Sequence, residues 1–118
     1  MDKVIEQSSS CIAVFHKYSE VKRALGALLA EGIDRHRVSL IGKDRQEGRV
    51  AKQGLHTLDD ELSALGVQDA NLHCYKCLIF GGAFLLIVTG SHAEIDEACH
   101  YLEKNEHADV SLHFNVSS

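Results

Sequence analysis

Two parts of this 118-residue chain share one spacing, and this repetition constrains the fold more than any other feature. Ser19 precedes Val38-Ser39-Leu40 by 19 residues, and Ser91 precedes Val110-Ser111-Leu112 by the same interval. Each serine also follows a short apolar run, at residues 11–16 and 84–88. The sequence therefore predicts two strand–helix–strand halves with a common plan.

The helix of each half is marked by signals at its ends. Ser19 is an N-cap candidate, and Gly32 is expected to end the first helix because glycine readily adopts the left-handed conformation. Ser91, with Glu94 three residues later, forms a capping-box pattern before the second helix. Apolar residues recur at helical spacing between these ends, namely Val21, Leu25, Leu28 and Leu29, and then Ile95, Ala98, Cys99 and Leu102.

The polarity of the four strands predicts their order in a sheet. Residues 84–88 are apolar on both faces and residues 11–15 nearly so, which is typical of central strands. Residues 38–41 and 110–116 alternate apolar with polar side chains, as half-exposed edge strands do. With right-handed crossovers, we expect an α+β, ferredoxin-like split β-α-β fold with a four-stranded antiparallel sheet in the order four, one, three, two. Both main helices would cover one face.

The middle of the chain, residues 45–80, is not required by this fold and predicts an inserted helical segment. Thr57 with Asp60 indicates a helix start, Gly66 indicates its end, and a second helix is expected at residues 69–80. The other face of the sheet would be apolar and needs a cover. We expect that these helices cover it or that two chains associate through the sheet face.

Length and composition indicate a single domain, residues 1–118, with a polar and flexible start at residues 1–9. The formal net charge of −5 argues against a nucleic-acid partner, which requires a basic surface. The start has no apolar signal-peptide core, and the longest apolar run, residues 78–88, is too short to span a membrane. We therefore predict a cytoplasmic protein without a membrane partner, whose four cysteines are reduced thiols.

Although the net charge is negative, four basic residues lie close together in the sequence. They are Lys43, Arg45, Arg49 and Lys52. Asp44 and Glu47 interrupt the cluster, and Gly48 and Gly54 lie within or beside it. This composition is typical of a solvated, mobile loop, which is the interpretation we favour over a binding patch.

The pattern His-Cys-x-x-Cys at residues 73–77 is the most specific chemical signal in the chain. Residues three apart share a face of a helix, so His73, Cys74 and Cys77 are candidate ligands for Zn²⁺ or Cu(I). A structural zinc site needs four ligands, for which Cys11 and Cys99 are further candidates. The alternative is that Cys74 and Cys77 are small core residues. Redox catalysis is disfavoured because Cys74 lies well inside the predicted helix.

Eight histidines are a high count for a chain of this length. Pairing of the first and last strands would bring His16 and His113 into one neighbourhood, which makes them candidates for ligand or metal contact at the open face. The sequence contains no nucleophile elbow, phosphate-cradling loop or pair of catalytic acids. We therefore name no catalytic residue and expect a non-enzymatic protein, with no cofactor apart from the alternative zinc or copper.

Several stretches resemble the bacterial general stress, or heat-induced stress, protein domain family. The first half resembles it at Ile12–Leu25, Gly32-Ile33-Asp34 and Val38–Asp44, and the second at Leu65-Gly66-Val67, Tyr75 and Gly81-Gly82 before Phe84–Val88. Many members of that family carry a long Gly/Ala-rich hairpin where this chain has the short polar stretch 45–56.

The resemblance implies a ferredoxin-like domain linked to stress responses, without catalytic residues. Together with the absence of catalytic motifs, it predicts an interaction or regulatory module, homodimeric through its sheet face, with a protein or small ligand as partner. The alternative is a metal-binding or metal-sensing domain that uses His73, Cys74 and Cys77.

Overall fold

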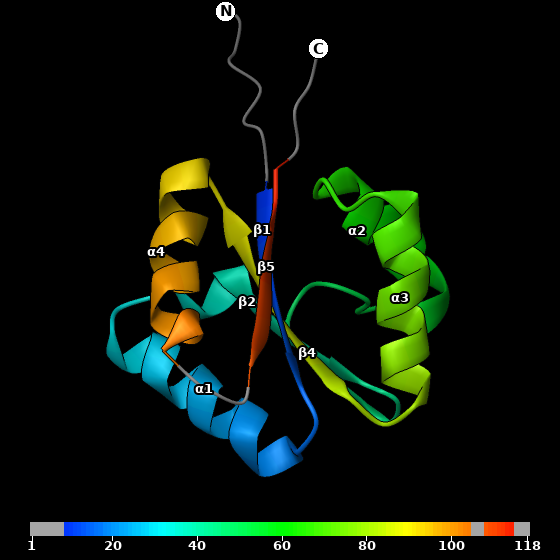
Figure 1. The fold of residues 1–118 in the computed structure, drawn as a ribbon, viewed down its shortest axis with the longest axis horizontal. Helices are drawn as coiled ribbons and strands as arrows, with labels where there is room; N and C mark the ends of the chain where they lie inside the picture. Colours follow the sequence, from blue (N-terminus) through cyan, green and yellow to red (C-terminus); the bar gives the residue numbers. More distant parts are fainter. Residues whose placement is uncertain (1–8, 105–107, 115–118) are drawn as a thin grey trace, which may run out of the picture.

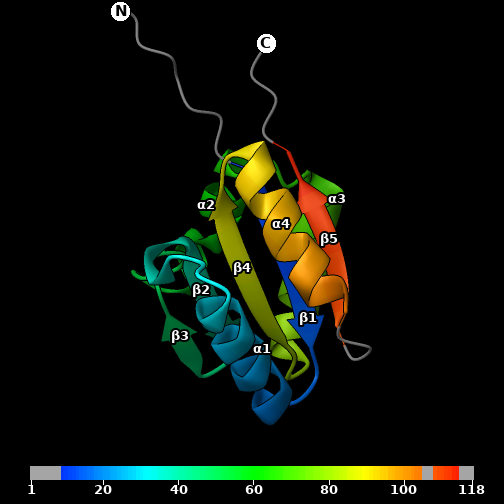
Figure 2. The same cartoon turned by 90° about the vertical axis from the view of Figure 1, so that its left-hand side faces the viewer.

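A computed structural model describes residues 9–104 and 108–114 of the chain. An antiparallel sheet of five strands runs through the middle of the molecule (Figure 1), and its strand order is β3-β2-β4-β1-β5 (Figure 2). The strands are β1 (Ser9–Phe15), β2 (Val38–Gly42), β3 (Arg45–Glu47), β4 (Phe84–Gly90) and β5 (Asp109–His113).

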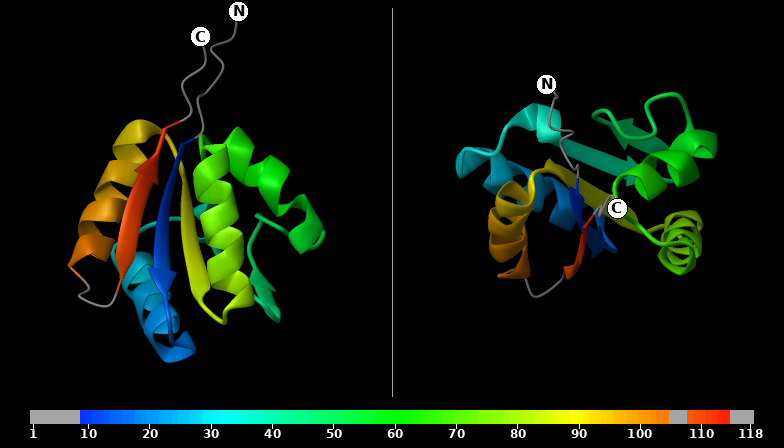
Figure 3. Two further views of the ribbon diagram at one scale, coloured as in Figure 1. Left: turned by 45° about the vertical axis from the view of Figure 1, so that its right-hand side comes forward. Right: turned by 90° about the horizontal axis from the view of Figure 1, so that it is seen from above.

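Helices cover both faces of this sheet. They are α1 (Tyr18–Ala30), α2 (Leu58–Ala64), α3 (Asp69–Phe80) and α4 (His92–Glu103), with two short 3₁₀ turns, η1 (Arg35–Arg37) and η2 (Leu55–Thr57). The views in Figures 1 and 3 place α1 and α4 on one side of the sheet and α2 and α3 on the other. The architecture is therefore three layers, helix, sheet and helix, with a core cluster on each side of the sheet.

The predicted four-stranded, ferredoxin-like sheet in the order four, one, three, two is wrong, because the sheet has a fifth strand. β3 follows a two-residue turn and pairs with β2, so that Glu47 lies opposite Leu40 and Arg45 opposite Gly42. Figure 2 shows β3 at the edge of the sheet beside β2. β2 is therefore not an edge strand, and all its residues are buried. β3 escaped prediction because it is only three residues long and entirely polar, so it lacks apolar alternation.

The second face of the sheet is covered by the helices of the middle segment. Ile41 of β2 and Ile87 of β4 are fully buried in one cluster with Leu62 of α2 and Ile79 of α3. The predicted helix at residues 69–80 is confirmed as α3. Because the chain covers this face itself, the apolar surface that motivated a sheet-to-sheet homodimer is not exposed.

The helix ends follow the sequence signals in part. The capping box of α4 is confirmed, with the Ser91 hydroxyl accepting from the Glu94 N–H at 3.3 Å and the Glu94 carboxylate accepting from the Ser91 N–H at 2.8 Å. Gly32 follows α1 with φ of 95°. Ser19 is not the cap of α1, because the helix starts at Tyr18, one residue before it.

Parts of two predictions fall at the ends of the chain. Of the predicted flexible start 1–9, only Ser9 is described, and it is buried in β1. The predicted closing strand 110–116 corresponds to β5, which ends at His113, and residues 115–116 lie outside the described part. In the described part of the chain, no helix has the length and apolar character needed to cross a membrane.

Candidate functional site

A polar groove lies at the end of the sheet where β2 begins and β4 ends. It comprises two hollows of about 370 and about 550 Å³, which share the lining residues His36, Arg49 and Thr89. The smaller hollow has an apolar side formed by Val50, Ala64 and Leu65. The larger hollow is more polar and is lined also by Asp34, Arg37, Ser91 and Glu94. We call these two hollows together the Arg49 groove.

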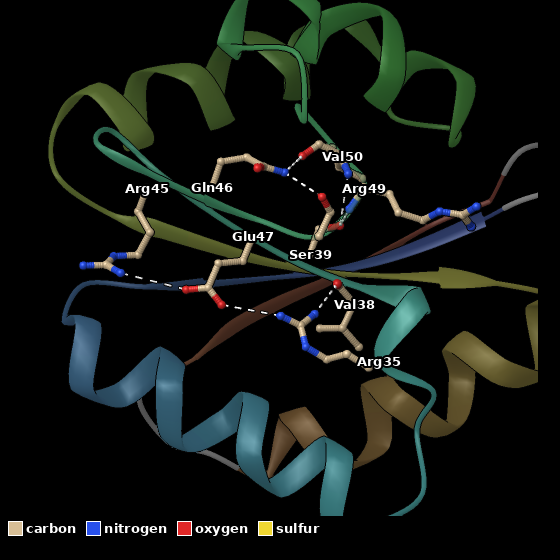
Figure 4. Close-up of polar contacts among 9 residues, drawn as sticks. Arg35, Val38, Ser39, Arg45, Gln46, Glu47, Arg49 and Val50 are labelled. Carbon is tan, nitrogen blue, oxygen red and sulfur yellow. Dashed lines mark hydrogen bonds and ion pairs between the residues drawn. The ribbon is translucent and has the colours of Figure 1, made fainter.

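The loop that carries Arg49 is anchored by side chains of β2 and β3. The Ser39 hydroxyl oxygen accepts hydrogen bonds from the N–H groups of Arg49 and Val50, both at 3.1 Å. The Gln46 amide nitrogen donates to the carbonyls of Gly48 and Val50, both at 2.8 Å (Figure 4). Ser39 is only 2% exposed, so water competes little for these bonds. The segment interpreted as a mobile loop is therefore anchored at Gly48–Val50.

Glycine is required at position 48 of this loop. Its φ of 99° is a conformation that other residues rarely adopt. A Cβ atom there would lie 2.6 Å from both the Ser39 hydroxyl oxygen and the Val38 carbonyl oxygen. The close contact between the loop and β2 thus depends on the absence of a side chain at position 48.

Two arginines near the loop already have carboxylate and aromatic partners. Arg35 approaches Glu47 at 3.5 Å and donates to the Val38 carbonyl at 3.0 Å. Arg45 lies 3.9 Å from the other oxygen of Glu47, and its guanidinium stacks 4.1 Å above the centroid of the Tyr18 ring. Both positive charges are therefore engaged outside the Arg49 groove.

Inside the groove, the acidic groups are also engaged. Glu94 forms an ion pair with Arg37, and the pKa of Glu94 lies below its usual range because of the Ser91 backbone N–H and the Arg37 guanidinium. Asp34 accepts from the backbone N–H of His36 at 2.9 Å. The charge of Glu94 is therefore partly offset by Arg37, whereas the backbone hydrogen bond to Asp34 leaves the negative charge of Asp34 in place.

Arg49 differs from these neighbours. Its guanidinium has no hydrogen bond or ion pair with any residue of the described ranges 9–104 and 108–114. Figure 4 shows its side chain extending away from the anchored loop. Glu61, which also lines the smaller hollow, uses its carboxylate to accept from the Ala51 N–H at 2.6 Å and the Thr57 hydroxyl at 2.8 Å. Arg49 thus brings to the groove a positive charge without an ion-pair partner among the described residues, on a backbone that Ser39 anchors.

Besides Arg49, the groove contains further polar side chains. His36 is exposed beside Arg49, and the Thr89 hydroxyl donates to the Arg37 carbonyl at 3.4 Å. Among the described residues of the groove, no hydroxyl is hydrogen-bonded to a histidine ring, which a serine or threonine nucleophile would require. The groove therefore offers a cation, polar groups and an apolar wall.

The predicted metal ligands lie together on α3 but do not converge as a set of three. The Nε2 atom of His73 and the Sγ atom of Cys77 are 3.6 Å apart. Cys74 and Cys77 are both exposed, so the alternative reading of them as core residues is wrong. In the part of the chain that the structure describes, no three His, Cys, Asp or Glu side chains form a group that could hold a metal. Cys11 of β1 and Cys99 of α4 are buried in the core on the opposite face of the sheet, where α1 and α4 pack.

His16 and His113 do not meet. The register of β1 and β5 places His113 opposite Ser10, six residues before His16, which corresponds to about 20 Å along a strand. His16 is exposed at the far end of β1. His113 instead faces α3, where its Nε2 atom lies 2.7 Å from the Tyr75 hydroxyl in a buried hydrogen bond.

Sequence reasoning overlooked Ser39 and Gln46 and assigned Arg49 to a solvated loop. The only sequence signal for this site was the basic cluster with Gly48 inside it, since an anchoring hydrogen bond from β2 to a loop ten residues later leaves no local pattern. The chain matches no family model, no curated protein and no solved structure. The resemblance to general stress proteins therefore stays a prediction.

Proposed function

We propose that this protein is a non-enzymatic binding module whose Arg49 groove holds a small organic anion with a carboxylate head and an apolar body. The observation that carries the proposal is the unpaired guanidinium of Arg49 on an anchored loop. An arginine is suited to this role because its planar group binds a carboxylate through two parallel hydrogen bonds.

The shape of the groove supports an anion with two different ends. Arg49 and His36 supply the polar side, whereas Val50, Ala64 and Leu65 supply an apolar side in the smaller hollow. Anchoring of the loop favours affinity, because less conformational entropy is lost when a pre-positioned group binds its ligand. A ligand with its anionic head at Arg49 and a short hydrocarbon body along Leu65 would contact both the polar and the apolar side of the groove.

A regulatory role connected with stress remains part of the proposal through the family resemblance alone. The occupied groove would act as a sensor, since a ligand that binds only the folded state stabilises that state. A compartment and a macromolecular partner are not identified by the groove. The cytoplasmic location and the protein partner expected from the sequence accordingly stay predictions.

A matched pair of ligands tests the proposal. Hexanoate and hexanamide have the same hydrocarbon body and differ in the charge of the head group. We expect hexanoate to raise the thermal unfolding midpoint in a saturable way and hexanamide to leave it unchanged, with inorganic phosphate weaker than hexanoate because it has no apolar body. Equal effects of hexanoate and hexanamide, or no effect of either, would contradict an anion site.

A further inference from the structure

The outer face of α3 carries an unusual set of exposed side chains. His73, Cys77 and Phe80 follow one another at intervals of four and three residues, so they lie on one stripe of the helix. All three are exposed, and Phe80 is 57% exposed, more than the other exposed large hydrophobic residues of the described part. Figures 1 and 3 show α3 as an outer layer of the molecule.

The distance between the two polar members of this stripe matches the geometry of a metal site. In tetrahedral zinc sites the Zn–S bond is about 2.3 Å and the Zn–N bond about 2.0–2.1 Å, which places neighbouring sulfur and nitrogen ligands about 3.5–3.6 Å apart. The Sγ atom of Cys77 and the Nε2 atom of His73 are 3.6 Å apart. The two atoms contact each other as a thiol–imidazole hydrogen bond, and the same distance also fits adjacent ligands of one ion.

In the described ranges 9–104 and 108–114, His73 and Cys77 form only half of a site. No third His, Cys, Asp or Glu within the described residues joins His73 and Cys77 in a group that could hold a metal. Cys74 precedes Cys77 by three residues but stands about 100° around the helix from His73. A structural zinc ion takes four protein ligands, so His73 and Cys77 leave two positions to be filled by other groups.

We propose that His73 and Cys77 bind Zn²⁺ together with the same two residues of a second copy of the chain, giving a His₂Cys₂ site on a two-fold axis. A two-fold axis supplies an identical ligand pair, which is the simplest way to complete a half-site. Each Cys77 thiol releases its proton to solvent when it binds the ion, whereas each His73 binds as neutral imidazole. Thiolate and imidazole ligands suit zinc among the common divalent cations.

Phe80 adds a second reason for a second copy at this face. It lies three residues beyond Cys77 on the same stripe, so two copies that share an ion at His73 and Cys77 bring their Phe80 side chains near the contact. Removing two exposed aromatic rings from water stabilises such a contact. This dimer uses α3 and differs from the sheet-to-sheet dimer expected from the sequence. It does not depend on the Arg49 groove.

Native mass spectrometry and light scattering of the full chain test this inference. The protein is stripped with EDTA, kept reduced with a phosphine so that no disulfide can form, and titrated with ZnCl₂. We expect conversion from monomer to dimer with one zinc ion bound per two chains. Cys77→Ser and His73→Gln should each abolish both zinc binding and dimerisation. Cys74→Ser removes a neighbouring exposed thiol and should leave both unchanged.

Three results would each overturn the proposed zinc site. Zinc bound one per chain without dimerisation would overturn the shared site, as would a dimer that persists in EDTA. Loss of zinc binding in Cys74→Ser would also overturn the proposed ligand set. Because His73, Cys74 and Cys77 are exposed, all three variants should unfold at the wild-type midpoint in EDTA, so a loss of binding in either ligand variant reports the site itself.

Discussion

The Tyr75 hydroxyl and the Nε2 atom of His113 lie 2.7 Å apart in a buried hydrogen bond that joins α3 to the edge strand β5. Tyr75 is 6% exposed and His113 is 9% exposed, and their rings meet edge to face at a centroid distance of 5.7 Å. Burial raises the pKa of Tyr75 and lowers the pKa of His113. Both groups are therefore held in their neutral forms, and the pair fixes α3 against the sheet.

The variant Tyr75→Phe should destabilise the protein by about 1–3 kcal/mol, because it leaves a buried ring nitrogen without its partner. The phenyl ring keeps the packing, so the loss reports the hydrogen bond. Urea unfolding measures the difference. Tyr18→Phe, which removes a hydroxyl without a hydrogen-bond partner in the described residues, is the matched control and should change stability by less than about 0.5 kcal/mol. Equal losses in the two variants would contradict the role of the pair.

Stability should fall as the pH drops below about 6.5. The unfolded chain has an ordinary histidine pKa near 6.5, whereas burial lowers the pKa of folded His113. The unfolded state therefore binds a proton first, and the stabilisation present above pH 6.5 is lost as the pH falls towards the folded pKa. Urea unfolding at several pH values from 7.5 to 5 measures this slope. The pKa of Glu94 is lowered in the folded state, so Glu94 changes the pH dependence of stability only near and below the ordinary glutamate pKa of about 4.3. This range lies outside the window of the measurement.

His113→Gln is the control for the pH dependence, because glutamine keeps a polar group but does not titrate. We expect the slope between pH 7 and 5 to be smaller in this variant than in the wild type. An unchanged slope would mean that another histidine carries the pH dependence.

Much of the fold could be predicted from the sequence because the signals were local. The capping box at Ser91 and the stop at Gly66 depend on residues a few positions apart, and both appear in the structure. The strand β3 could not be predicted, since Gln46 owes its place to pairing with Ile41 and not to any preference of its own. For the same reason, the sequence could not predict that the sheet has a fifth strand at its edge.

The candidate site was less predictable than the fold. In the sequence Arg49 is one member of a basic cluster, and its anchors, Ser39 and Gln46, belong to no local pattern. His73 and Cys77 were singled out from their spacing, whereas the distance between His16 and His113 follows from strand register, which the sequence did not determine. Local motifs are readable in the sequence, but contacts between distant segments are not.

Ser39→Ala should release the loop that carries Arg49. Two N–H groups lose their buried acceptor, which costs about 1–3 kcal/mol of stability. Hydrogen exchange at the amides of Arg49 and Val50 should accelerate more than exchange in β1. Ser63→Ala, at an exposed position of α2, should change neither measurement. Slow exchange at Arg49 and Val50 in Ser39→Ala would contradict the anchoring.

Glu94→Gln should strengthen anion binding in the Arg49 groove. The change removes a negative charge and frees Arg37, whereas glutamine still serves in the capping box. A unit charge about 4 Å away contributes about 1 kcal/mol in bulk water and less at longer range, so hexanoate should bind up to about fivefold more tightly. Titration calorimetry at low salt measures the change, and a weaker affinity would contradict the proposed position of the anion.

The most direct test of the account is titration calorimetry of hexanoate with Arg49→Gln and Lys52→Gln. Each variant removes one positive charge from an exposed side chain of the same segment, but of the two residues only Arg49 lines the groove. Loss of a charged hydrogen-bond donor costs about 1.5–3 kcal/mol, so Arg49→Gln should weaken binding by at least about tenfold, and Lys52→Gln should leave it nearly unchanged. Equal affinities of the two variants would contradict an anion site at Arg49.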